Sequence, residues 1–174
     1  GQSESGWMIS TVGDSKFFKE PIAHNRGTTV HADELFFNVP ARRKFLKSER
    51  AENRQIETVV KKISLANMSV AFSYAQSGIS KNERGLRKLE LKAGDPHQRL
   101  ADVLSPDFVE NSIFLDETRN RYRLFGWIGV PSHNRAQRDQ QFFYVNKRPV
   151  KDEVVNQGVR QAYKDLMYGR WHAV

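Results

Sequence analysis

The sequence Phe36-Phe37-Asn38-Val39-Pro40-Ala41-Arg42-Arg43-Lys44-Phe45-Leu46 changes from a strand pattern to a helix pattern at its proline. Before it, residues 28–37 are rich in β-branched and aromatic types, which predicts a strand. Pro40 suits the first position of a helix, because the N–H that proline lacks needs no partner there. Asn38 is close enough to cap the free amides of that first turn. We therefore expect a strand over residues 28–37 that leads into one continuous helix over residues 40–67.

The expected helix has one apolar side and one basic side. At about 100° per residue, the apolar side predicts a buried stripe made of Phe45, Ile56, Val59, Val60 and Ile63. The basic side spans an arc of roughly 120° and holds Arg43, Lys44, Lys47, Arg50, Arg54, Lys61 and Lys62. On a continuous helix Lys44 and Lys62 would point the same way about 27 Å apart. An arc of one charge sign can follow a phosphate backbone, although a solvated helix face is an equally good interpretation of the charge alone.

The composition favours a polyanionic partner. The 174 residues include 28 Lys and Arg against 20 Asp and Glu, a net charge of +8. A protein this basic is attracted to nucleic acid or, less often, to an anionic membrane surface. No apolar run approaches the roughly 18 residues that would span a membrane, and the polar start at residues 1–5 does not resemble a signal peptide. The absence of cysteine excludes disulfides and thiolate metal sites and is compatible with the cytosol.

The rest of the chain alternates short strand and helix patterns, which predicts an α+β fold. A cap followed by proline predicts a helix from Asp95 to Leu104, and Asp152 is expected to cap another helix. Residues 79–88 are polar and basic and are typical of a linker, so we expect a domain boundary near residues 80–90. Strands are expected over residues 6–12, 19–22, 69–74, 89–91, 112–115, 122–130 and 141–145, and from residue 171 onward.

Motifs for catalysis are missing from the sequence. There is no glycine-rich phosphate loop, no nucleophile elbow and no histidine spacing that suits a metal. The residues by themselves therefore favour a binding module over an enzyme.

Two segments resemble a known family. Residues 27–30 (Gly-Thr-Thr-Val) and 35–46 resemble the G-T-T-V … L-F-F/Y-N-x-P-A-R-x-K-F-L signature of the MutL family of DNA mismatch repair proteins. The segment Phe143-Tyr144-Val145-Asn146-Lys147-Arg148-Pro149-Val150 is similar to the Y-V-N-x-R strand and turn of the same family. The unbroken F-x-N-x-P-A-R-R-K-F-L run resembles bacterial members more than their eukaryotic paralogues.

The resemblance implies two domains. Residues 1–88 would be the C-terminal part of a GHKL-type ATPase α/β sandwich, and residues 89–174 a transducer domain, ribosomal-protein-like, with a left-handed βαβ crossover. ATP and Mg²⁺ are the cofactors of the full-length family. This chain lacks the family's catalytic glutamate, its Mg²⁺-binding asparagine, its nucleotide-binding aspartate and its glycine-rich lid. We therefore expect the chain alone to bind no cofactor and to turn over no ATP.

The resemblance also assigns candidate site residues. Gly27 and Thr28 match the family's G-T motif beside the adenine, although an ordinary strand opening is the alternative. Arg148 matches an arginine in the DNA groove between protomers, and Lys44, Lys47 and Lys62 match basic positions of the helix that flanks it. A solvated turn is the alternative for Arg148, and a local pair with a carboxylate the alternative for Lys44. No catalytic or metal-binding residue is expected.

The family role implied is that of a matchmaker. ATP binding would close two N-terminal regions into a dimer over DNA, and the protein would signal from MutS to a MutH-type endonuclease and a helicase. Contacts to duplex and single-stranded DNA would be non-specific, no membrane would be involved, and the location would be the bacterial cytoplasm near the nucleoid. The alternatives are a stand-alone nucleic-acid-binding module without nucleotide regulation, a piece of a type II topoisomerase, and a scaffold for acidic proteins.

Overall fold

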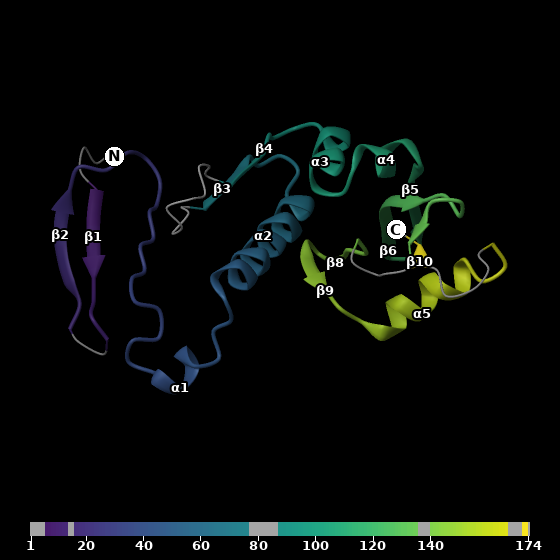
Figure 1. Cartoon of the computed structure of the whole chain (residues 1–174). Coiled ribbons are helices and arrows are strands. Elements are labelled where there is room, and N and C mark those ends of the chain that lie inside the picture. The colour runs from purple at the N-terminus through teal and green to yellow at the C-terminus, as the bar shows by residue number, and fades with distance from the viewer. Residues whose placement is uncertain (1–5, 14–15, 77–86, 136–139, 167–171, 174) are drawn as a thin grey trace. The chain divides into compact units, whose positions relative to one another are not determined.

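Helices and short strands are mixed along the whole chain in the computed structural model, which confirms the α+β prediction (Figure 1). The structure describes residues 6–13, 16–76, 87–135, 140–166 and 172–173. It divides into two compact units, Gly1–Glu49 and Arg50–Val174. The expected linker at residues 79–88 lies almost entirely outside the described residues, and the domain boundary near residues 80–90 stays a prediction.

The first unit contains an antiparallel hairpin. Strand β1 (Gly6–Ser10) pairs with β2 (Phe18–Ile22) in a register that runs from Gly6 opposite Ile22 to Ser10 opposite Phe18. These strands confirm the predictions for residues 6–12 and 19–22. A cation–π contact also joins the two strands: the ammonium of Lys19 in β2 lies 4.3 Å from the ring centroid of Trp7 in β1.

The predicted strand over residues 28–37 is wrong. The chain turns instead, with Glu34 at φ 48° and Phe36 at φ 63°, and the Phe37 amide donates to the Glu34 carbonyl at 2.8 Å. β-branched and aromatic residues favour a strand only where a neighbouring strand accepts their side chains and backbone hydrogen bonds. Within the described part of this unit no strand pairs with residues 28–37, so local hydrogen bonds close a turn.

The expected continuous helix is also wrong, because two helices replace it. Helix α1 (Pro40–Arg43) begins at the predicted proline, but Val39 stands at its N-cap and no side chain, including that of Asn38, caps it. Helix α2 (Glu49–Ala66) follows after a break. Arg42 and Arg43 lie in the last turn of α1, where positive charge favours a helix end, and Ser48 directly precedes α2, as N-cap residues do. The alignment of Lys44 with Lys62 along one helix therefore does not exist.

The stripe that was predicted to be buried on this helix is largely exposed. Ile56, Val59 and Ile63 of α2 keep 47, 53 and 44% of their surface accessible. Among the described residues of α2 only Ser64 is buried. An apolar stripe is buried only where another element packs on it, and no described element covers this one fully.

The second unit begins with α2 and builds a small core after it. Strand β3 (Phe72–Gln76) pairs antiparallel with β4 (Arg87–Leu91), and helices α3 (Pro96–Val103) and α4 (Pro106–Glu110) follow. Asp95 and Ser105 cap these helices, so the prediction for α3 is confirmed, while the short α4 was not expected. The buried apolar residues of the described chain all come from this region: Leu91, Leu100, Val103 and Phe108.

A buried arginine ties the end of α2 to this core. Arg99 of α3 is 1% exposed, and its guanidinium donates to the backbone carbonyls of Ser64, Val70 and Lys92 at 2.8, 2.7 and 2.6 Å. It also lies 5.5 Å from the ring centroid of Phe72. Burial lowers the pKa of Arg99, and the charge of Asp102 partly opposes that shift. The last turn of α2 is thus fixed to the segment that leads into α3.

The rest of the second unit is made of hairpins and one helix. Strands β5 (Ser112–Arg119) and β6 (Tyr122–Gly129) form the longest pair, and β8 (Phe143–Val145) pairs with β9 (Arg148–Val150). Helix α5 (Glu153–Ala162) follows with Asp152 as its cap, as predicted. Strand β10 (His172–Ala173) pairs with β7 (Asn134–Arg135). None of the described helices combines the length and apolar character needed to cross a membrane. The GHKL-type and transducer assignments stay predictions.

Candidate nucleic-acid interface

The hairpin of β8 and β9 presents two cationic residues at its tip. Its two-residue turn consists of Asn146 and Lys147, both at positive φ (49° and 66°), which is the geometry of a type I′ turn. Val145 pairs with Arg148 across the turn. Asn146, Lys147 and Arg148 are all exposed. The tip therefore carries two adjacent positive charges in water, where a phosphate can reach them.

The base of the same hairpin is attached to α2. The hydroxyl of Tyr144 in β8 donates a hydrogen bond to the backbone carbonyl of Lys62 at 2.9 Å, across 82 residues of sequence. Burial raises the pKa of Tyr144 to about 12. The structure therefore brings together the elements that carry two of the predicted site residues, Lys62 and Arg148.

Side chains alternate between the two faces of this hairpin. Residues directly opposite each other share a face, so Tyr144 shares one with Pro149, and Val145 shares the other with Arg148. Tyr144 is hydrogen-bonded to α2, and Arg148 lies on the opposite face of the hairpin. The side chain of Arg148 is exposed there.

Lys62 has a different environment from that of Arg148. It is half-buried, and its neighbour Lys61 forms an ion pair with Glu57 at 2.9 Å, one helical turn earlier. The basic side of α2 is therefore partly neutralised by a carboxylate. The predicted arc of positive charge is shorter and weaker than the sequence suggested.

Lys44 and Lys47 lie outside this arrangement. Both are exposed, and both lie in the first unit, between α1 and α2. Their role in a DNA contact stays a prediction.

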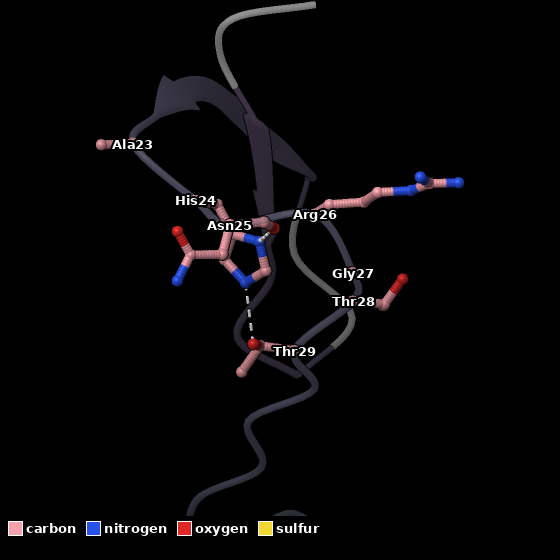
Figure 2. Close-up of a pocket in the computed structure, with 7 residues that line it drawn as sticks. All are labelled: Ala23, His24, Asn25, Arg26, Gly27, Thr28 and Thr29. Atoms are coloured by element: carbon pink, nitrogen blue, oxygen red, sulfur yellow. Dashed lines mark hydrogen bonds between the residues drawn. The ribbon is translucent and has the colours of Figure 1, made fainter. Parts of the chain in front are cut away.

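Gly27 and Thr28 line a hollow in the first unit. It is formed by seven consecutive residues of one loop: Ala23, His24, Asn25, Arg26, Gly27, Thr28 and Thr29 (Figure 2). The imidazole of His24 bridges the loop, since Nδ1 donates to the Asn25 carbonyl at 2.6 Å and Nε2 forms a hydrogen bond with the Thr29 hydroxyl at 2.8 Å. Gly27 has φ 146°, a conformation that an L side chain rarely adopts.

This hollow provides only part of what a nucleotide needs. Its volume is about 700 Å³, but all of its lining residues are exposed. Nucleotide-sized ligands are bound where apolar walls enclose most of their surface. Within the described ranges, no three His, Cys, Asp or Glu side chains gather where they could hold a metal ion.

Sequence reasoning singled out Arg148 as a candidate but not Lys147 or Tyr144, which lie in the same hairpin. The turn that exposes Lys147 had a local signal, because Asn146 tolerates the positive φ that the first central position of a type I′ turn requires. The role of Tyr144 had no local signal, since its partner lies 82 residues away.

Comparison with known proteins gives consistent matches. Residues 100–174 match the family model described as "DNA mismatch repair protein, C-terminal domain". The chain is 41% identical over 174 residues to the DNA mismatch repair protein MutL of Cellvibrio japonicus, covering 98% of this chain and 27% of that protein. It is 39% identical over 170 residues to the MutL protein of Azotobacter vinelandii, covering 95 and 26%. The MutL protein of Pseudomonas syringae is 36% identical over 177 residues, covering 98 and 26%. The chain thus spans about a quarter of the length of these relatives.

Proposed function

We propose that this chain, which belongs to the MutL family of DNA mismatch repair proteins, contributes a sequence-independent DNA contact to the whole protein. The contact is made by Lys147 and Arg148 at the tip of the β8–β9 hairpin and by Lys62 of α2. Lysine and arginine side chains contact phosphates without reading the bases, so duplex and single-stranded DNA would both bind.

The hydrogen bond between Tyr144 and Lys62 is the observation that carries this proposal. It links the hairpin with the exposed cations to a helix that contributes a further lysine. The net charge of +8 adds a long-range attraction to any polyanion. Lys44 and Lys47 are proposed as additional phosphate contacts on the strength of their match to the family motif alone.

For the whole protein we propose the matchmaker role of the family. Residues 1–88 would belong to a GHKL-type ATPase domain, with Gly27 and Thr28 on the adenine side, and residues 89–174 to the transducer. ATP and Mg²⁺ would close two N-terminal regions into a dimer over DNA in the cytoplasm. That state would signal from MutS to a MutH-type endonuclease and a helicase. Support comes from family membership.

A salt titration of DNA binding tests the proposed contact. Fluorescence anisotropy with a mixed-sequence duplex, from about 50 to 200 mM salt, would compare the unmodified chain with Arg148→Glu and Lys62→Glu. We expect weaker binding, and a slope of log K against log salt that is smaller by about 1 for each phosphate that the variant no longer neutralises. Arg119→Glu, an exposed charge reversal at the end of β5, is the matched control. Unchanged affinity and slope for both test variants would remove the hairpin and α2 from the DNA site.

A further inference from the structure

We propose that Tyr144 is a positioning residue for Arg148: its hydroxyl anchors the β8–β9 hairpin on α2, and this anchor holds Arg148 in the orientation that contacts DNA. This inference rests on the proposed function, because it assumes that Arg148 contacts phosphate. It assigns to Tyr144 no contact with DNA of its own.

The hairpin needs an anchor because it is very short. β8 and β9 pair over only three positions: Phe143 with Val150, Tyr144 with Pro149, and Val145 with Arg148. An isolated two-stranded hairpin is marginally stable in water even when it is longer. Lys147 lowers the stability of the hairpin further, since a residue other than glycine at positive φ raises the energy of the turn. A contact outside the hairpin is therefore required to keep one conformation populated.

The hydrogen bond of Tyr144 meets that requirement at the right place. Its side chain leaves the face opposite to that of Arg148 and reaches the Lys62 carbonyl at 2.9 Å. The acceptor is itself rigid, because the Ser64 carbonyl in the same turn of α2 is held by the buried Arg99. Arg99 in the core thus holds the end of α2, α2 holds Tyr144 through its hydrogen bond, and Tyr144 belongs to the hairpin that carries Arg148.

The chain supplies a matched control in Tyr163. Its hydroxyl donates to the backbone carbonyl of Gly129 at 2.7 Å, and Tyr163 is half-buried like Tyr144. Tyr163 directly follows α5, and its hydrogen bond attaches the C-terminal end of this helix to β6 and not to the β8–β9 hairpin. Tyr163→Phe therefore removes a hydrogen bond of the same kind, in the same unit, without touching the support of Arg148.

A double-mutant cycle on DNA affinity tests the role of Tyr144. The variants are Tyr144→Phe, Arg148→Gln and their combination, with Tyr163→Phe and its combination with Arg148→Gln as the control cycle. Affinity is measured by anisotropy on a mixed-sequence duplex at low salt, under conditions where circular dichroism shows every variant to be folded. Tyr144→Phe should weaken binding by roughly 2- to 10-fold, the range expected when one hydrogen bond is removed. Arg148→Gln should then cost little more in the Tyr144→Phe background, but its full amount in the Tyr163→Phe background.

A second measurement keeps the test independent of DNA. Amide hydrogen exchange should accelerate within residues 143–150 in Tyr144→Phe, and this segment should be unaffected in Tyr163→Phe. If Arg148→Gln costs the same in both tyrosine backgrounds, or if exchange in the hairpin is unchanged, the positioning role of Tyr144 is overturned while the DNA contact stands. If Arg148→Gln has no effect in the unmodified chain, the proposed function fails first and this inference fails with it.

Discussion

The guanidinium of Arg99 donates a hydrogen bond to the backbone carbonyl of Ser64 at 2.8 Å, although the two residues are 35 positions apart in the sequence. Both residues are buried, at 1 and 0% exposure. The Ser64 carbonyl belongs to the last turn of α2, where helix carbonyls lack partners inside the helix and carry partial negative charge. The arginine therefore satisfies buried backbone acceptors where another protein would use a C-cap or water.

Arg99→Met is expected to lower the free energy of unfolding of the second unit by about 2–4 kcal/mol, because it leaves buried carbonyls without a donor. Methionine fills much of the same space, so the loss reports the hydrogen bonds more than a cavity. Urea unfolding followed by circular dichroism measures it. Arg160→Met, at an exposed position of α5, should change stability by no more than about 0.5 kcal/mol. A loss of similar size in both variants would show that Arg99 is not a special support of α2.

Lys147→Gly is expected to stabilise the β8–β9 hairpin and weaken DNA binding together. Glycine adopts the φ of 66° at this position without steric cost, which should be worth about 1 kcal/mol locally, and Asn-Gly is the preferred type I′ turn. The variant also removes one exposed positive charge. Slower amide exchange in residues 143–150 and a lower DNA affinity would be the two results.

Arg148→Gln is the comparison for that experiment, since it should lower DNA affinity and leave hairpin exchange unchanged. Faster exchange in Lys147→Gly would contradict the turn geometry. An unchanged DNA affinity would take Lys147 out of the contact.

The elements that could be predicted from the sequence are those with local signals. Asp95 followed by Pro96 marks the start of α3, and Asp152 marks the start of α5; both carboxylates accept amide hydrogen bonds in the structure. The strand expected over residues 28–37 could not be judged in this way, because a strand needs a partner and periodicity does not report one. The break before α2 was not predicted, because the regular spacing of charges favours one continuous helix.

The candidate site likewise contains residues with a local sequence signal and residues whose role depends on a tertiary contact. Arg148 was singled out from a sequence motif and is exposed in the hairpin, and its DNA contact stays a prediction. The link from Tyr144 to Lys62 is a tertiary contact and could be found only in the structure. The basic arc drawn on a continuous helix was wrong because it depended on five uninterrupted turns, and α2 begins only after Lys44 and Lys47.

The 174-residue chain is expected to show no ATP turnover of its own. The hollow at Gly27 and Thr28 is lined by exposed residues, so it would enclose little of the surface of a nucleotide. Phosphate release from ATP in the presence of Mg²⁺, with and without DNA, should stay at the level of the buffer. Hydrolysis that co-elutes with the chain through a final sizing column, and is abolished in Gly27→Val, would contradict this prediction.

The phenol of Tyr144 should ionise near pH 12, well above the value of about 10 for a tyrosine in water. Its pKa is raised in the folded state because burial disfavours the tyrosinate, so the folded state holds its proton more tightly than the unfolded state does. The stability that this difference provides is fully present below pH 10 and is lost as the pH rises toward 12. Absorbance near 295 nm should therefore show a late tyrosine step that disappears in Tyr144→Phe. Tyr163→Phe should keep that step, because the pKa of Tyr163 is raised by its own burial and not by that of Tyr144. If Tyr144→Phe leaves the late step intact, the phenol of Tyr144 is not buried in solution as it is in the structure.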